Sequence, residues 1–130
     1  MSASDTPRPY EDWRTVSRDR AEDAAHNFGF HLMRHCRNEA MRQLESAAVP
    51  NSSEEFRAQV ATAVDTALHN VMDLLEGFWS TEAGPNHTTQ YALSVCVAGA
   101  DGKEVERIEI SPCQLDLPIG YWKWKDGEFR

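Results

Sequence analysis

The clearest structural signal in the chain is SSEEFRAQVATAVDTALHNVMDLLEGFW, which spans residues 52–79. Its apolar residues recur at every third or fourth position, so they line one stripe of an amphipathic helix. The stretch opens with the pattern of a capping box, because Ser52 stands three positions before Glu55. We predict a helix from about residue 53 to 79. Its buried stripe consists of Phe56, Val60, Ala63, Val64, Ala67, Leu68, Val71, Leu74, Leu75 and Phe78.

An earlier helix is predicted on the N-terminal side of Pro50, which breaks the helical pattern. Its apolar residues follow one another at a constant spacing of four, which is typical of a ridge that packs on a second helix. We predict a helix from about residue 10 to 48, paired with the later helix in an antiparallel hairpin. The polar residues 1–9 are predicted to form a disordered lead. The ridge consists of Ala24, Phe28, Leu32, Cys36, Ala40 and Leu44.

The hydrophobic period changes to two after a predicted loop over residues 80–88. Alternation in 90–97 predicts a strand, Asp101-Gly102 predicts a hairpin turn, and 103–111 predicts the return strand. Residues 121–129 alternate again and predict a third strand. The expected fold class is α+β: an N-terminal antiparallel helical hairpin packed on a small C-terminal antiparallel sheet of two or three strands, over about residues 89–130. Residues 10–130 are expected to form one domain.

The charge of the chain is acidic and unevenly distributed. The net charge is −8, and residues 43–118 carry twelve acidic residues against three basic ones, which gives that segment about −9. An acidic body repels phosphate, so we expect no direct binding of nucleic acid. No apolar run approaches the roughly 18 residues of a membrane helix, so no membrane association is expected. The expected location is the cytoplasm.

Cysteine usage favours a reducing compartment. The chain has three cysteines, Cys36, Cys96 and Cys113, and none lies in a C-x-x-C pair. An odd, sparse set is unlike a secreted disulfide scaffold. We interpret the three as reduced and mostly buried, with a Cys96–Cys113 bridge between strands as the alternative.

Histidines at helical spacing raise the question of a metal site. His31 and His35 stand four apart on the first helix, and His69 and Asp73 stand four apart on the second. At 100° per residue, however, His69 points almost opposite the centre of the apolar stripe. We therefore expect Asp65, His69, Asp73 and Glu76 to form a solvated outer face, and we predict no metal and no cofactor.

The segment IGYWKWKDG, residues 119–127, gathers aromatic and basic residues. As a strand it would place Tyr121 with the lysines on one face and the tryptophans on the other. Such aromatics either close the core of the sheet or anchor a protein interface. The candidate partner-binding residues are two acids of the return strand and three of these aromatics: Glu106, Glu109, Tyr121, Trp122 and Trp124.

Three functional hypotheses follow from these patterns. We favour a non-enzymatic protein-binding module, of the kind represented by immunity proteins and inhibitors that mask a basic partner surface. The sequence contains no catalytic or cofactor-binding motif, so no catalytic residue is predicted. The second hypothesis is a small metal-dependent or Cys/His enzyme using His31, His35, His87 or Cys113. The third is a structural subunit that forms a homodimer through its sheet edge or its helix faces.

Overall fold

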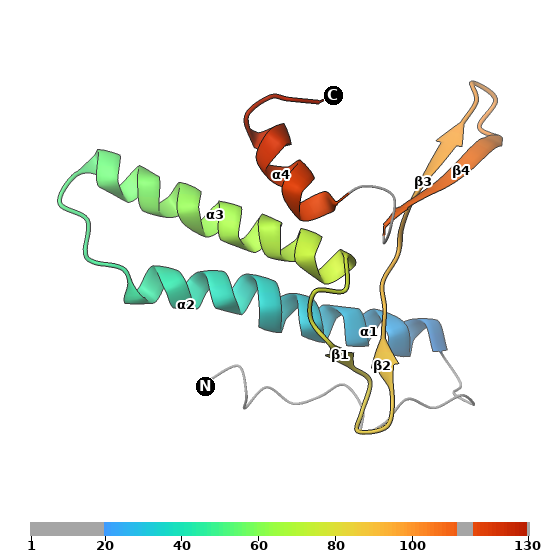
Figure 1. Cartoon of the computed structure of the whole chain (residues 1–130), viewed down its shortest axis with the longest axis horizontal. Helices are drawn as coiled ribbons and strands as arrows, with labels where there is room; N and C mark the ends of the chain where they lie inside the picture. The colour runs from blue at the N-terminus through green and yellow to red at the C-terminus, as the bar shows by residue number, and fades with distance from the viewer. Residues whose placement is uncertain (1–19, 112–115, 130) are drawn as a thin grey trace.

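The computed structural model describes residues 20–111 and 116–129, and it confirms the α+β class (Figure 1). None of the described helices combines the length and the apolar character that crossing a membrane requires. The elements, in chain order, are α1 (Arg20–Leu32), the π-helical turn η2 (Met33–Arg37), α2 (Asn38–Ser46), α3 (Ser53–Leu75), β1 (Thr81–Glu82), β2 (Thr88–Thr89), β3 (Leu93–Ala98), β4 (Glu104–Ser111) and α4 (Leu117–Lys125).

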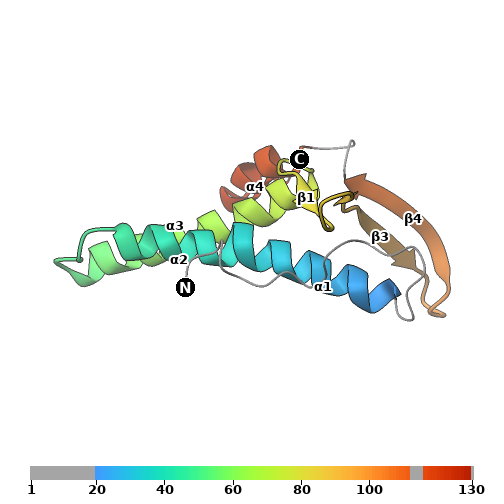
Figure 2. The same cartoon turned by 90° about the horizontal axis from the view of Figure 1, so that it is seen from below.

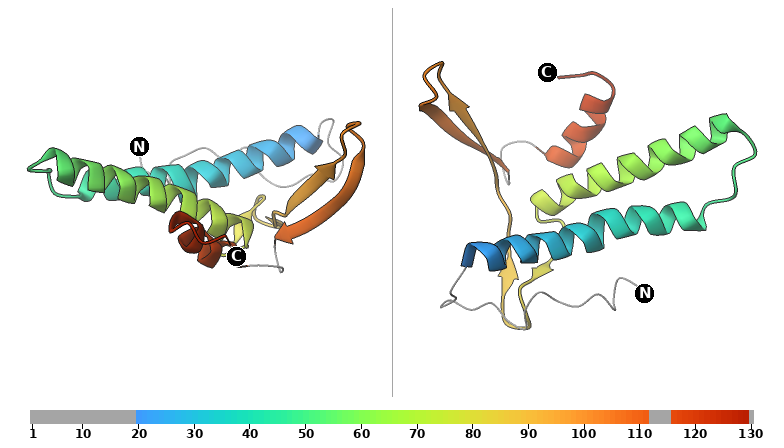
Figure 3. Two further views of the ribbon diagram at one scale, coloured as in Figure 1. Left: turned by 90° about the horizontal axis from the view of Figure 1, so that it is seen from above. Right: turned by 180° about the vertical axis from the view of Figure 1, so that it is seen from behind.

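The predicted helical hairpin is present. α1, η2 and α2 form one continuous helix that lies antiparallel to α3 (Figures 1 and 3). The Ser52 cap at the start of α3 is confirmed, because the Glu55 N–H donates to Ser52 Oγ over 3.1 Å. The Glu55 carboxylate also reaches back, as in a capping box, but it accepts from the Asn51 N–H, one residue before the N-cap, over 2.6 Å. The part of the first helix predicted over residues 10–19 lies outside the described residues.

The end of α3 differs from the prediction because a glycine stops the helix early. Gly77 has a φ of +75°, its N–H donates to the Leu74 carbonyl, and the Phe78 N–H donates to the Asp73 carbonyl. This pair of bonds is a Schellman motif, in which glycine adopts the left-handed conformation at low cost. α3 therefore ends at Leu75 rather than near residue 79. Phe78 leaves the apolar stripe and is 74% exposed.

A π-helical turn shifts the buried face of the first helix. The buried residues along it are Asn27, His31, Cys36 and Ala40, at successive steps of four, five and four. The step of five coincides with η2, where the helix holds one extra residue in the turn. The predicted ridge is therefore correct at Cys36 and Ala40. In the N-terminal half of the helix it is displaced by one position, because Asn27 and His31 are buried there instead of Phe28 and Leu32.

The strands form two separate antiparallel pairs, β1 with β2 and β3 with β4. The Asp101-Gly102 turn is confirmed, with Gly102 at φ +80° and Asp101 Oδ1 accepting from the Lys103 N–H over 3.0 Å. The β3–β4 hairpin does not pack on the helices as predicted. It extends away from them, as Figures 1 and 2 show, and α4 covers α3 instead.

The predicted third strand over 121–129 is wrong, because Leu117–Lys125 is the helix α4. Asp116 caps its start by accepting from the Ile119 N–H over 3.2 Å, Pro118 lies in its first turn, and Gly127 ends it at φ +83°. These helix signals outweigh the short alternation of apolar and basic residues. Gly120 leaves room for the Trp124 ring, since a Cβ there would lie 2.7 Å from that ring and would force it to move.

The largest buried apolar side chains lie where α4 meets the end of α3, while the smaller Cys36 and Ala40 are buried along the first helix. Leu74 and Leu117 are 1% and 2% exposed and are the largest apolar side chains that are fully buried. Ser111, which is also fully buried, donates its hydroxyl to the Leu75 carbonyl over 2.9 Å. The hydrogen bond gives an unpaired carbonyl at the end of α3 a partner. The end of the β3–β4 hairpin is thereby tied to the helical core.

Candidate functional site

α4 is held on α3 by one carboxylate that accepts two hydrogen bonds. The Tyr121 hydroxyl donates to Asp65 Oδ1 over 2.7 Å, and Lys125 Nζ lies 2.8 Å from Asp65 Oδ2. The contact with Lys125 lowers the pKa of Asp65 most, and the hydrogen bond from Tyr121 lowers it further. Burial, and then the bond to Asp65, raise the pKa of Tyr121 to about 12. Tyr121 and Lys125 lie one helical turn apart, so the helical spacing of α4 aims both at one acceptor.

A cleft of about 580 Å³ opens beside this contact, between the C-terminal half of α3 and the start of α4. It is lined by His69, Asp73, Glu76, Phe78, Asp116, Pro118 and Ile119. The α3 residues among them were expected on a solvated outer face. The structure instead places Asp73 at 8% exposure, and the His69 side chain is 25% exposed. α4 covers this face, and the expectation failed because α4 was predicted as a strand.

Asp73 is the most buried acid of the cleft. His69 Nδ1 lies 3.5 Å from Asp73 Oδ2, and the His69 ring also stands 5.1 Å from the Trp122 ring. Burial raises the pKa of Asp73, the nearby Asp116 carboxylate adds to the rise, and His69 opposes it. The net direction shows that the surroundings of Asp73 stabilise its negative charge less than water does.

Two further acids bring α3 and the start of α4 together. Glu76 Oε1 accepts from the Leu117 N–H over 3.3 Å, which places its carboxylate at the positive end of the α4 dipole. Asp116 is the N-cap of α4 and uses Oδ1 for the Ile119 N–H. Each carboxylate keeps a second oxygen that these bonds do not use. No lysine or arginine is among the residues that line the cleft in the described structure.

The walls of the cleft are apolar and exposed. Phe78 is 74% exposed on one side, and Ile119 is 61% exposed on the other. A site that joins three carboxylates to apolar walls is suited to an organic cation with an aliphatic stem, such as a lysine or arginine side chain. Among the described residues there is no group of three His, Cys, Asp or Glu side chains arranged to hold a metal ion.

The five predicted partner-binding residues do not form one surface. Glu106 and Glu109 are exposed on β4, whereas Tyr121, Trp122 and Trp124 lie on α4, and the two elements stand apart in Figures 1 and 3. Tyr121 faces Asp65, and Trp122 is 44% exposed beside His69. The residues that sequence reasoning missed are Asp73, Glu76, Phe78, Asp116 and Ile119. The signal that could have found them is the helix pattern from Asp116 to Gly127.

His31 and His35 belong to a different part of the molecule. His31 is 1% exposed, and its Nε2 lies 2.8 Å from the Glu82 carbonyl, which also accepts from Asn27 Nδ2 over 2.9 Å. The His35 ring stacks between His31, at 5.7 Å, and Trp79, at 4.6 Å. Burial first, and then His31 and Arg34, lower the pKa of His35. These contacts hold the β1–β2 segment against α1.

The remaining candidates for nucleophilic chemistry are dispersed. Cys36 is buried as predicted, and burial raises the pKa of its thiol to about 11. Cys96 is exposed, contrary to the prediction, and its thiol donates to Glu104 over 3.1 Å. His87 lies in the turn between β1 and β2. Cys113, and with it the alternative Cys96–Cys113 bridge, lies outside the described residues.

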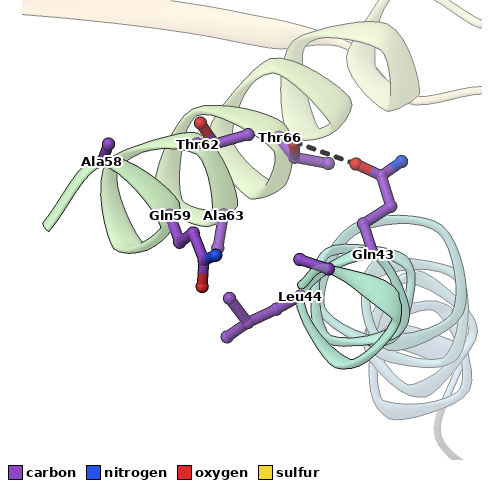
Figure 4. Close-up of a pocket in the computed structure, with 8 residues that line it drawn as sticks. Gln43, Leu44, Ala58, Gln59, Thr62, Ala63 and Thr66 are labelled. Atoms are coloured by element: carbon purple, nitrogen blue, oxygen red, sulfur yellow. Dashed lines mark hydrogen bonds between the residues drawn. The ribbon is translucent and has the colours of Figure 1, made fainter. Parts of the chain in front are cut away.

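A second, smaller pocket of about 190 Å³ lies between α2 and α3 (Figure 4). Leu44 and Ala63 point into the space between the helices, and Thr66 donates to Gln43 Oε1 over 3.4 Å across it. The described residues that line it include no titratable side chain: Gln43, Leu44, Ala47, Ala58, Gln59, Thr62, Ala63 and Thr66. The pocket therefore offers no acid–base or ionic chemistry from these residues, and the cleft beside α4 remains the candidate site.

Comparison of the chain with family models, with curated proteins and with solved structures found no match.

Proposed function

We propose that the chain is a protein-binding module whose α3–α4 cleft receives a basic side chain of a partner protein. The observation that carries the proposal is the buried Asp73 carboxylate, which shares the cleft with Glu76 and Asp116 and with no lysine or arginine of the described chain. A cation entering the cleft would offset the unfavourable burial of this charge.

The surroundings of the cleft support a protein partner over a free ion. Phe78 and Ile119 expose apolar surface at its edges, and Trp122 stands beside His69 on the same side of α3. Aromatic and aliphatic side chains around a buried charge are typical of the centre of a protein interface. The net charge of −8 would speed the approach of a basic partner through long-range attraction. Masking of a basic surface, as inhibitors and immunity proteins do, is the form of binding that these features favour.

A second function, acid–base catalysis, is favoured by one observation. His69 and Asp73 form a pair 3.5 Å apart inside a cleft, and the raised pKa of Asp73 is a property shared with many catalytic acids. The described residues that line the cleft supply carboxylates and one imidazole but no serine, threonine, cysteine or lysine. Proton transfer between the His69–Asp73 pair and a bound substrate is the reaction that this pair favours, and binding remains the simpler use of the site.

The proposal is tested with short peptides of defined charge. The isotopically labelled protein is titrated with a peptide of alternating arginine and glycine, and backbone amide shifts are followed by nuclear magnetic resonance. We expect shifts at the end of α3 and the start of α4. A glutamate–glycine peptide of the same length should cause none. Shifts absent from the cleft at saturating arginine peptide would contradict the proposal.

The matched variants remove equal charge at two places. The double variant Asp73→Asn, Asp116→Asn keeps the shape of both side chains, and it keeps the N-cap of α4 because asparagine also caps helices. It should weaken arginine-peptide binding at least tenfold. Glu106→Gln with Glu109→Gln removes the same charge from β4 and should leave binding within about twofold. The opposite result would assign the binding site to the acids of β4.

A further inference from the structure

The β3–β4 hairpin is an incomplete sheet. Its strands pair only with each other in the described chain, and the hairpin extends away from the helices (Figures 1 and 2). Val95, Val97 and Ile108 share one face, because Val95 pairs with Ile108 and Val97 lies two positions from Val95. Each of the three is 41–43% exposed. A two-stranded sheet alone is marginally stable in water, and pairing with further strands that share an apolar face stabilises it.

β4 offers the longer free edge for such a strand. It runs for eight residues, Glu104–Ser111, and within the described chain β3 is its one neighbour in the sheet. A long edge of this kind is a template for pairing with another chain. β3 runs for six residues and carries no charged side chain, so no electrostatic contact would set a register along its edge.

The charges of β4 favour one symmetric partner. In an antiparallel pair of two β4 strands, the residues opposite each other are set by the residue at the two-fold axis. With Ile108 at the axis, each Arg107 stands opposite the Glu109 of the other copy, and the two Ile108 side chains meet. Registers centred on Glu106, Arg107 or Glu109 would instead place a charged residue opposite its own copy. Opposite charges across strands stabilise a pair, and like charges destabilise it.

The faces of the hairpin agree with this register. Arg107 pairs with Cys96 and Glu109 pairs with Ser94, so both side chains lie on the face opposite to Val95 and Ile108. The two Arg107–Glu109 contacts would therefore lie on the polar face, and the Ile108 contact on the apolar face. Arg107 lies 2.8 Å from Glu104 within its own strand, but the two side chains are 62% and 47% exposed. An exposed pair of this kind is weak enough for a second acid to compete.

We propose that two copies of this chain associate by antiparallel pairing of β4 with β4, centred on Ile108, to form one four-stranded sheet. The partner is thus a second copy of the same chain, selected by the reciprocal Arg107–Glu109 contacts. The proposal concerns the edge of β4 and does not depend on the function of the α3–α4 cleft.

The test uses variants that repel themselves but attract each other. Arg107→Glu sets two acids opposite each other in both contacts, and Glu109→Arg sets two basic residues opposite each other. Each variant alone should be monomeric by sedimentation at concentrations where the natural chain is dimeric, with the dissociation constant raised at least tenfold. An equimolar mixture should restore the dimer, because both contacts between unlike variants join opposite charges. Restoration by mixing reports an intermolecular contact and cannot arise from repair within one strand.

The pairing in the mixed dimer follows from the register. One of its two contacts joins the new acid of the first variant to the new basic residue of the second, and the other joins the unchanged Arg107 to the unchanged Glu109. Both contacts therefore unite opposite charges, whereas each variant paired with itself has like charges in both.

Two further measurements keep the result decisive. Arg57→Glu changes the net charge as much as Arg107→Glu does, from an exposed position on α3, and should leave the dimer intact. Ile108→Cys, in a chain with Cys96 and Cys113 replaced by serine, should give a covalent dimer on mild oxidation, since residues facing each other at the axis lie within disulfide range. Circular dichroism confirms that each variant is folded.

A natural chain that is monomeric at millimolar concentration, or a mixture of variants that stays monomeric, would overturn the proposal.

Discussion

The Tyr121 hydroxyl donates a 2.7 Å hydrogen bond to Asp65, a residue 56 positions earlier in the chain. Together with Lys125, which contacts the other oxygen of the same carboxylate, this bond sets where α4 lies along α3. The position of α4 in turn creates the cleft, because the residues at its start face the end of α3. Asp116, Pro118 and Ile119 lie across from His69 and Asp73 of α3 and from Glu76, which follows it directly. The contacts of Tyr121 and Lys125 with Asp65 thus act on the same helix whose first turn forms one wall of the candidate site.

The contribution of this contact can be measured with a double-mutant cycle. Tyr121→Phe and Asp65→Asn should each lower the free energy of unfolding, and the coupling between them should be about 1–2 kcal/mol, as expected for a hydrogen bond to a charged group. Urea unfolding of the two single variants and the double variant gives the coupling. Glu128→Gln, which changes an exposed acid beyond α4, is the control. Additive effects of the two substitutions would show that the bond does not hold α4 in place.

The core at the end of α3 can be tested with two leucines of the same helix. Leu74 is 1% exposed, and Leu68 is 45% exposed. Leu74→Ala should lower the free energy of unfolding by roughly 2–5 kcal/mol through lost burial and the cavity left behind. Leu68→Ala should cost less than about 1 kcal/mol. Chemical denaturation measures both, and equal losses would contradict the burial described for α3.

The charged Asp73 carboxylate should lower the free energy of unfolding of the chain, although it is the group proposed to bind the cation. Its pKa is raised on folding, so the folded state binds more protons than the unfolded state between the two pKa values, and stability falls as pH rises through that interval. Asp73→Asn removes the buried charge. We expect the variant to be more stable than the natural chain at pH 7, and the difference should shrink to its minimum near about pH 3, where both states carry a protonated Asp73.

The measurement is a set of urea melts from acidic to neutral pH on the natural chain and on Asp73→Asn. The binding proposal adds a second expectation, because the same substitution should weaken the arginine peptide while it stabilises the fold. Such an exchange of stability for function is common at sites that bury a charge. A variant that is less stable at pH 7 would show that His69 compensates the carboxylate in full.

Local signals were sufficient at the start of α3 and at the β3–β4 turn. Ser52 and Glu55 specify the start of α3, since the capping bonds join residues within one turn. Asp101 and Gly102 specify the β3–β4 turn for the same reason, because Gly102 supplies the positive φ that the turn requires. The apolar stripe likewise predicted a helix in this stretch and the burial of Leu74. Its extent to residue 79 was wrong, although Gly77 carried the local signal for an earlier end.

Other features depended on contacts between distant segments, which a period in the sequence does not contain. The step from His31 to Cys36 is one residue longer than a helical turn, and the extra residue sits where the His35 carbonyl accepts from Asn70 of α3 over 2.9 Å. The cleft depends on α4 lying over Asp73. The five predicted partner-binding residues were expected on one sheet, but α4 is a helix on α3, so they are divided between β4 and α4. The start of α3, the hairpin turn and the acidic charge follow from the amino-acid sequence alone, because each depends on residues close together in the chain or on composition. Which face of α3 is covered could not be read from the sequence, because burial depends on which distant segment packs there.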